Sequence, residues 1–278
     1  ERPRRQETGG RRSRRASPPY FSPRRFEMTA VATSSDRYAE QFARFTRQTT
    51  LSGALASLRD DAFSCFDRLG FPTTRLEEWR FTNIARIAEK PFVAPTTRTD
   101  YTRADLDALH LPRLGGPELV FVNGTFAPAL STTDGLPAGV RTRSLATALA
   151  HDHDDDAEAV ALRLGRLARI ESQAFTALNT AFLRDGAVVE VASGAVVTTP
   201  IHLLFVTRSG AEPVLSQPRV LVLAGANSQV RVVESHAGDG ETPYLSNTVT
   251  EISLSMTRPS FTRQEINCMA CDPVEERK

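Results

Sequence analysis

Two clusters of residues in this sequence carry side chains of the kinds that bind metals. Cys268 and Cys271 form a Cys-x-x-Cys pair, and thiolates are ligands of zinc and of iron–sulfur clusters. Such sites normally take four ligands, whereas the third cysteine of the chain, Cys65, falls on the apolar stripe of a predicted helix. We therefore predict that the pair binds no metal or cluster, and that Cys65 is a buried thiol that packs as a small hydrophobic residue.

Histidines and acids elsewhere give weaker signals. His151–Asp156 is a run of imidazoles and carboxylates, but adjacent ligands in a polar loop rarely close around an ion, so we predict a solvated acidic loop. His202 and His236 fall on predicted strands, where a single histidine is usually packed or exposed rather than a ligand. Asp239 and Glu241 fall in a glycine-rich turn and are predicted to be solvated.

Carboxylates on predicted strands are of the kind that a polysaccharide hydrolase or lyase uses. That chemistry needs two carboxylates on neighbouring strands, one as acid and one as base or nucleophile. The strand acids here are Glu190, Glu234 and Glu251, with no aspartate pair near them, and the chain lacks a phosphate-binding Gly-x-x-x-x-Gly-Lys loop. We therefore predict no catalytic, cofactor-binding or metal residues. A β-solenoid polysaccharide hydrolase or lyase stays open as the alternative function.

The stretch from Ala187 to Ile252 has the pattern of a stack of short strands. Each strand is rich in Val, Ile, Leu, Thr or Phe and is bounded by turn-forming residues; the predicted strands are Ala187–Val191, Ile201–Val206, Arg219–Ala224, Gln229–His236 and Leu245–Ile252. No helical pattern fits between them, and two-residue hairpin turns are missing, so a simple meander is not favoured. A sandwich or a β-solenoid remains. Val220–Leu223 is apolar on both faces, so we expect a layer that covers its outer face.

Helices are predicted before these strands. Asp36 suits the N-cap of a first helix, whose apolar stripe contains Tyr38, Phe42 and Phe45. A second helix ends at Gly70 and Pro72. Its stripe contains Leu51, Leu55, Leu58, Ala62, Cys65, Phe66 and Leu69.

Further elements are predicted from local signals. Thr74 and Glu77 have capping-box spacing, which predicts that a helix starts there. Trp79 is predicted to pack this helix against the preceding one. The other signals are a strand at Leu119–Val122, a hairpin turn at Asn123-Gly124, an N-cap at Ser144 and a short helix at Phe175–Phe182.

Length and charge bound the class of protein. The 278 residues allow one large domain or two ordinary ones. No apolar run approaches the ~20 residues of a membrane helix, and the first residues carry no apolar signal-peptide core, so we predict a cytoplasmic protein with no membrane partner. Residues 1–27 hold nine Arg and three Glu, a net charge of +6, so the remainder carries −5 of the total of +1. A mildly acidic body does not indicate a nucleic-acid binder.

Residues 1–27 are rich in Arg, Ser and Pro and lack apolar periodicity, which predicts disorder. Three interpretations stay open: a basic arm that binds nucleic acid or an acidic surface, a transit peptide, or read-through from upstream of a true start at Met28. We favour the last, because Met28-Thr29-Ala30 opens a segment of ordinary composition.

The segment Gly70–Asn83 has the most distinctive local sequence: Gly-hydrophobic-Pro-Thr, then Glu-Glu-Trp, an aromatic residue and Thr-Asn. It resembles the N-terminal signature of SufD in the SufB/SufD family, whose members are subunits of the SUF system for iron–sulfur cluster assembly. The resemblance covers about residues 36–252 and implies a right-handed parallel β-helix, which favours the solenoid over the sandwich. Later motifs that agree with the family are Asn123-Gly124, Ser144-Leu145, Asn179–Phe182, Asp185-Gly186 and Pro200-Ile201.

The resemblance implies a non-catalytic scaffold subunit whose partners are a SufB-like paralogue and a SufC-like ATPase. In the family, late coils of the β-helix meet SufB and a C-terminal helical domain meets SufC. Neither region is recognised here, and Ser253–Lys278 has the composition of a polar tail from a truncated or frame-shifted reading frame. We therefore expect a truncated form that folds in its N-terminal part, self-associates and forms no SUF complex.

The predicted fold class is mainly β with a helical N-terminal region, that is, a partial right-handed parallel β-helix preceded by an N-terminal α-rich domain. The predicted domains are a disordered basic extension (1–27), a helical domain with a small hairpin (28–170), a partial β-helix core (171–252) and an irregular tail (253–278).

Overall fold

The computed structural model describes residues 34–49, 53–95, 99–150, 155–239, 242–255 and 266–268. Helices predominate up to Ala181 and strands from Gly186 onward, which confirms a helical N-terminal part followed by strands. The predicted extension and most of the predicted tail lie outside the described residues, and the predicted domain boundaries stay a prediction. In the part of the chain that the structure describes, the helices lack the length and the apolar surface that are needed to span a bilayer.

The first two helices follow their predicted stripes. Tyr38 and Phe45 are buried, and Gly70 ends the second helix with a φ of +62° while its N–H donates to the Phe66 carbonyl. The first helix begins at Ser34, two residues before the predicted N-cap. The helices are α1 Ser34–Gln48, α2 Gly53–Leu69, α3 Ala85–Glu89, α4 Arg103–Ala108, α5 Leu145–Ala148, α6 Asp155–Ala161 and α7 Ala174–Ala181, with 3-10 turns η1 Glu77–Trp79 and η2 Pro128–Leu130.

The prediction of a helix from the capping-box spacing after Pro72 is wrong. Only η1 forms there; Leu76 is its N-cap and no side chain caps it. Leu76 is exposed and η1 buries no residue, so a longer helix would have no packed face to stabilise it. Trp79 packs on Phe175 of α7, with ring centroids 5.3 Å apart. A capping box does form between Thr102 and Asp105, where it opens α4.

The strands agree with the predicted order and differ in detail. The strand predicted from Gln229 begins at Val232, and the last predicted strand is divided at Asn247 into two. Asn123 and Gly124, with φ of +49° and +75°, form the predicted hairpin turn. The strands are β1 Glu118–Val122, β2 Thr125–Phe126, β3 Val140–Ser144, β4 Gly186–Val191, β5 Ile201–Arg208, β6 Val214–Ser216, β7 Arg219–Ala224, β8 Val232–Asp239, β9 Tyr244–Ser246, β10 Val249–Leu254 and β11 Ile266–Cys268.

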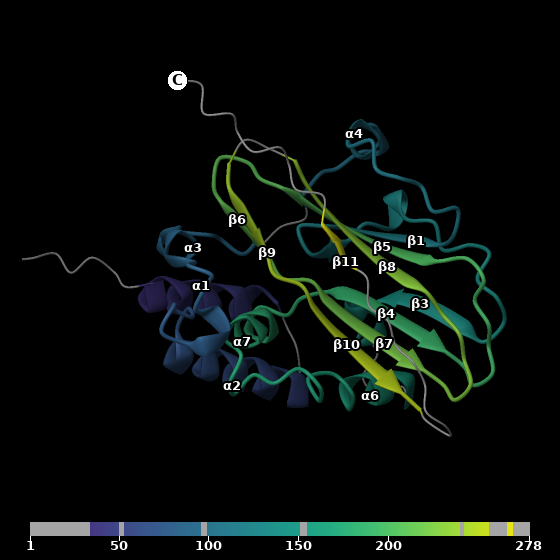
Figure 1. Ribbon diagram of the computed structural model, residues 1–278, viewed down its shortest axis with the longest axis horizontal. Helices are drawn as coiled ribbons and strands as arrows, with labels where there is room; N and C mark the ends of the chain where they lie inside the picture. Colours follow the sequence, from purple (N-terminus) through teal and green to yellow (C-terminus); the bar gives the residue numbers. More distant parts are fainter. Residues whose placement is uncertain are drawn as a thin grey trace, which may run out of the picture. The chain divides into compact units, whose positions relative to one another are not determined.

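The strands pair in three sheets (Figure 1). Their orders are β11-β8-β5-β1-β2, β10-β7-β4-β3 and β6-β9. From β4 onward each strand pairs in parallel with the third strand after it, so that β4, β7 and β10 are neighbours, as are β5, β8 and β11. Among the described strands, antiparallel pairing is confined to β1–β2 and β3–β4, and one isolated antiparallel bridge joins Glu118 to Thr132. The prediction that the strands do not form a meander is therefore confirmed.

Apolar side chains fill the space between the two larger sheets and cover both outer faces. Val220 and Val222 of β7 belong to the cluster between the sheets, together with Leu203 and Phe205 of β5. Leu221 belongs to a second cluster with residues of α5 and α6 on the outer face, as Figure 1 shows for α6. The predicted covering layer over Val220–Leu223 is therefore confirmed. Residues of α4 cover the opposite outer face, that of β1 and β5.

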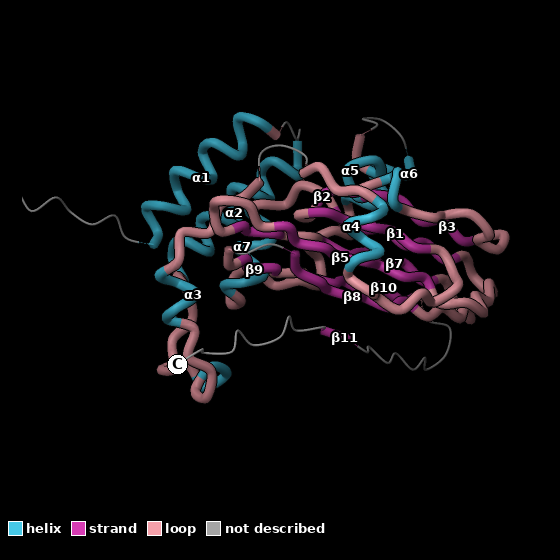
Figure 2. Tube along the Cα trace, turned by 90° about the horizontal axis from the view of Figure 1, so that it is seen from above, coloured by secondary structure: helices cyan, strands magenta, loops and turns pink. Residues whose placement is uncertain are grey.

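A separate apolar cluster joins the N-terminal helices to the two-stranded sheet. Figure 2 shows α1, α2, α3 and α7 gathered at one end of the strands, near β9. Leu215 of β6 is buried in this cluster, and Leu245 of β9 packs against it. Gln41 of α1 donates to the Phe92 carbonyl at 2.8 Å and accepts from the Ala94 N–H, which fixes the chain after α3 against α1.

Tyr38 provides a test of this cluster. Its ring packs edge-on against Phe66, Phe71 and Phe182, but no described residue forms a hydrogen bond with its buried hydroxyl, and burial raises the pKa of Tyr38 to about 12. Tyr38→Phe should leave the free energy of unfolding unchanged or raise it by up to ~1 kcal/mol, since it removes an unpaired polar atom. Tyr38→Ala should lower it by ~3–5 kcal/mol. Urea denaturation measures both; a loss above ~1 kcal/mol for Tyr38→Phe would reveal a partner for the hydroxyl.

Candidate functional site

The described residues contain no group of three or more His, Cys, Asp or Glu side chains that could hold a metal ion. Cys271 lies outside the described residues, and Cys268 ends β11, where its backbone is in register with His236 of β8. The prediction that the cysteine pair binds no metal therefore stays a prediction. Cys65 is half-buried and packs against the apolar cluster of α1, α2 and α7, as expected of a small hydrophobic residue.

Most of the acidic run His151–Asp156 also lies outside the described residues. Asp155 and Asp156 begin α6, so the end of the predicted loop is helical.

His202 lies in a hydrogen-bonded row across β1, β5 and β8. Its Nδ1 is 2.9 Å from a carboxylate oxygen of Glu118, its Nε2 is 2.9 Å from Ser235 Oγ, and its side chain is 2% exposed. The bond to His202 holds the pKa of Glu118 below its ordinary value, although burial opposes this. Carboxylate, imidazole and hydroxyl in this order can activate a serine. Ser235, however, is buried within a strand that is paired on both sides, so we assign the row a structural role.

Two acids of β8, Glu234 and Asp239, lie beside basic side chains. His236 stacks on Phe205, with ring centroids 5.1 Å apart, and lies 3.9 Å from Glu234. The prediction that Asp239 lies in a turn is wrong, because β8 extends to this residue and sets it beside Arg208 of β5 in register. The Asp239 side chain stays partly exposed. The Arg208 guanidinium is 2.6 Å from the Asp239 carboxylate. Glu241 lies outside the described residues.

The three strand acids all form ion pairs or hydrogen bonds with neighbouring side chains of the chain. Glu190 pairs with Arg143 at 2.8 Å and with Arg141 at 3.3 Å. Glu234 accepts a hydrogen bond from Thr250 Oγ1 at 2.7 Å, and Glu251 is buried and ion-paired. An acid and a base for polysaccharide cleavage would have to face a substrate, so this arrangement does not support the alternative function.

Arg219, the first residue of β7, is fully buried and was missed by sequence reasoning. Its Nε donates to Glu251 Oε1 at 3.0 Å, and its Nη1 donates to Asn179 Oδ1 at 2.8 Å and to Thr180 Oγ1 at 3.1 Å. Burial lowers the pKa of Arg219, and the charge of Glu251 opposes that shift. The signal in the sequence is an arginine that opens an apolar strand, with an acid in the next strand of the series.

Glu251 and Asn179 extend this pairing to the backbone. Glu251 accepts hydrogen bonds from the N–H groups of Gly165, Leu167 and Ala168 at 2.8, 2.9 and 3.2 Å. Asn179 donates to the carbonyls before β7 and β10, those of Pro218 and Asn247. The Arg219 network, as we call these residues, therefore fixes the segment after α6, helix α7 and the starts of β7 and β10 together.

Asp185 has a similar role at the start of β4, the preceding strand of the same sheet. Its carboxylate accepts from the N–H groups of Phe126, Ala146 and Gly186 at 2.9, 3.0 and 2.8 Å, and burial raises its pKa against these bonds. Gly186 packs so closely on the Arg219 carbonyl that a Cβ at this position would overlap it. The Asp-Gly pair therefore aligns β4 with β7.

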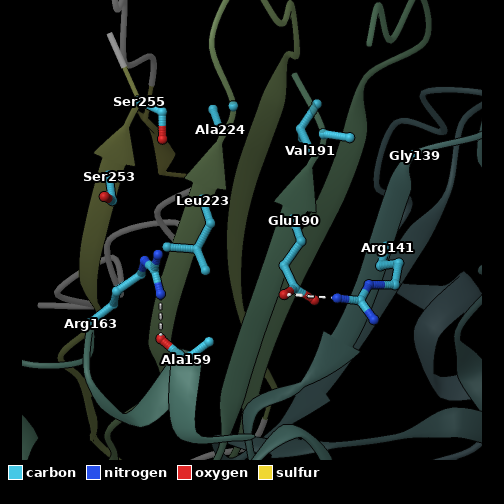
Figure 3. Close-up of a pocket in the computed structure, with 12 residues that line it drawn as sticks. Gly139, Arg141, Ala159, Arg163, Glu190, Val191, Leu223, Ala224, Ser253 and Ser255 are labelled. Carbon is cyan, nitrogen blue, oxygen red and sulfur yellow. Dashed lines mark hydrogen bonds and ion pairs between the residues drawn. The ribbon is translucent and has the colours of Figure 1, made fainter. Parts of the chain in front are cut away.

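A groove of about 470 Å³ lies on the outer face of the four-stranded sheet, at the carboxyl ends of β4, β7 and β10 (Figure 3). In the figure, Arg163 and Arg141 lie on opposite sides of it, with Glu190 between them. Its described lining combines guanidinium, carboxylate and hydroxyl groups with small residues. The groove is lined by Gly139, Arg141, Ala159, Arg163, Glu190, Val191, Ala192, Leu223, Ala224, Gly225, Ser253 and Ser255.

Comparison with known protein families matches residues 32–203 to the family described as the SufBD protein N-terminal region. The match covers more than half of the chain. This chain belongs to the SufBD family. The distinctive segment Gly70–Asn83 and the motifs Asn123-Gly124 and Ser144-Leu145 lie inside the matched residues. The resemblance inferred from the sequence is therefore confirmed at the level of the family.

An iron–sulfur cluster assembly SufBD family protein of Synechocystis sp. is 33% identical to this SufBD family chain over 213 residues. The alignment covers 74% of this chain and 46% of that protein. The chain thus spans less than half the length of this relative.

Glu251→Gln tests the Arg219 network of this SufBD family chain. It leaves the buried guanidinium without a counter-charge, so the free energy of unfolding should fall by ~3–5 kcal/mol. Glu190→Gln is the matched control, because it removes a more exposed ion pair and should cost no more than ~1 kcal/mol. Urea denaturation compares the two variants, and equal losses would show that Arg219 does not depend on Glu251.

Glu118 should make stability depend on pH. Its pKa in the folded chain lies below the ordinary value of 4.5, so its contribution is fully present above about pH 4.5 and is lost as the pH falls through the folded pKa. The difference in unfolding free energy between the wild type and Glu118→Gln should therefore shrink as the pH falls from about 6 to about 3. Denaturation at several pH values measures it. A constant difference would mean that the His202 contact does not favour the ionised carboxylate.

Proposed function

We propose that this SufBD family chain is a SufD-like, non-catalytic scaffold component of cytoplasmic iron–sulfur cluster assembly. The family match over residues 32–203 carries the proposal. The Synechocystis relative, whose description names iron–sulfur cluster assembly, supports the same role.

We further propose that the parallel strands are turns of a right-handed parallel β-helix. The series β4, β7 and β10 begins at Gly186, Arg219 and Val249, so about 30 residues separate equivalent strands. The series β5, β8 and β11 and the pair β6 and β9 keep comparable spacing in two further sheets. Equivalent strands that return in parallel at a constant interval are expected of a solenoid, and parallel crossovers are almost always right-handed.

A scaffold role agrees with the way the chain uses its charged residues. Arg219, Glu251 and Asp185 bind backbone and side chains of distant elements, and so define how strands and helices align. Glu190 and Glu234, the other strand acids, are also held by neighbouring side chains. These charged side chains thus bind other residues of the chain and stabilise the arrangement of its strands. We therefore propose the scaffold in preference to a polysaccharide hydrolase or lyase.

The proposed partners are a SufB-like paralogue and a SufC-like ATPase. They follow from family membership, and we assign no contact residue of this chain to either.

Deletion of the gene in its source organism tests the proposed role. We expect the specific activities of iron–sulfur enzymes to fall several-fold, while enzymes without iron keep theirs, because assembly and not protein synthesis is impaired. A chromosomal copy with an affinity tag should restore these activities. Contrary to the expectation from the sequence that no SUF complex forms, it should also co-purify with the SufB-like and SufC-like proteins, because family membership implies these partners.

The matched variants are Glu251→Gln and Glu190→Gln, introduced into the tagged copy. Only the first should fail to complement, since it breaks the buried network that aligns β7 with β10. Unchanged iron–sulfur enzyme activities in the deletion strain would contradict the proposal. So would a tagged copy that restores activity without retaining either partner.

A further inference from the structure

The groove of Figure 3 exists because the helices leave one region of the sheet uncovered. Val160 and Leu164, in and after α6, pack on Val188 and Leu221 near the middle of β4 and β7. Two residues further along these strands, Glu190 and Leu223 are only half-buried and line the groove. The groove is thus an open area on a face that is otherwise packed.

Pairing register sets the floor of the groove. Ser253, Leu223, Glu190 and Arg141 lie in one row across β10, β7, β4 and β3. The next outward positions hold small residues, among them Gly225, where a Cβ would meet the backbone of Ser193. Backbone therefore packs closely at this end of the groove, and the row of Ser253, Glu190 and Arg141 supplies polar side chains.

The charge of the groove is unbalanced. Glu190 has two guanidinium partners, Arg143 and Arg141, and in the described part of the chain Arg163 contacts no carboxylate. Among the described residues, two arginines and one acid line the groove, and Arg143 pairs with that acid from outside the lining. The Arg141 side chain is 53% exposed and lies 3.3 Å from Glu190, whereas Arg143 is 24% exposed and lies at 2.8 Å. An exposed ion pair of this kind contributes about 0–1 kcal/mol, so Arg141 can exchange Glu190 for a ligand while Arg143 keeps the carboxylate neutralised.

We propose that this groove binds a small phosphorylated molecule. Arg163 and Arg141 hold the phosphate from two sides, since planar guanidinium groups match its oxygen atoms and carry the compensating charge. The hydroxyls of Ser253 and Ser255 supply further donors, and Leu223 and Ala159 contact the carbon skeleton. A volume of about 470 Å³ is ample for a phosphate with an organic group and lies in the range of ligand sites.

Calorimetric titration of the full chain with inorganic pyrophosphate at low ionic strength tests this. We expect saturable 1:1 binding that weakens as salt is added. Arg163→Gln should weaken it at least tenfold. Arg166→Gln is the matched control, because both arginines lie on the same segment and bond the carbonyl four residues before them, while only Arg163 lines the groove. Arg166→Gln should change the affinity less than twofold.

Glu190→Gln provides a test of opposite sign. It removes a carboxylate that competes with the ligand for Arg141, and among the described residues no other carboxylate lines the groove, so pyrophosphate should bind several-fold more tightly. Unfolding curves of the three variants should match that of the wild type to within ~1 kcal/mol, since each changes a partly exposed side chain. The proposal is overturned by an absence of saturable binding, by equal losses in Arg163→Gln and Arg166→Gln, or by weaker binding in Glu190→Gln.

Discussion

The buried ion pair between Arg219 and Glu251 is the interaction on which the arrangement of this SufBD family chain depends. A guanidinium that is fully buried is tolerated only where opposite charge and hydrogen-bond acceptors surround it. Here those groups are Glu251 of β10 and Asn179 of α7. The Glu251 carboxylate also accepts hydrogen bonds from backbone N–H groups of the segment after α6. One charge therefore determines where a strand, a helix and a loop meet.

Other features of the chain follow from this alignment. Strands β4, β7 and β10 can stack in parallel because their starts are fixed by Asp185, Arg219 and Glu251. Apolar rows then fill the space between the two larger sheets, and α6 packs on the outer face. The segment that Glu251 holds begins two residues after Arg163, so the buried network also positions one wall of the arginine-lined groove.

Local signals in the sequence predicted the elements better than their pairing. The bounds of β7 are those predicted, because an apolar run between Pro218 and Gly225 needs no distant information. The break between β9 and β10 could not be predicted, since Asn247 interrupts the strand by bonding the Phe175 carbonyl 72 residues away. The capping-box spacing after Pro72 misled for a similar reason: no packed face stabilises a helix there. Arg219 was missed because its partners lie 32 and 40 residues away, beyond any local pattern.

Hydrogen exchange at the backbone amides of Gly165 and Leu167 measures the central claim most directly. Both amides lie in a segment between helices, and the Leu167 side chain is exposed, so without the Glu251 carboxylate they would exchange as a surface loop does. We expect them to exchange as slowly as the interior amides of β7, because the ion pair must open before either N–H is released. Exchange at the rate of a free loop, alongside a protected β7, would contradict the role assigned to the Arg219–Glu251 pair.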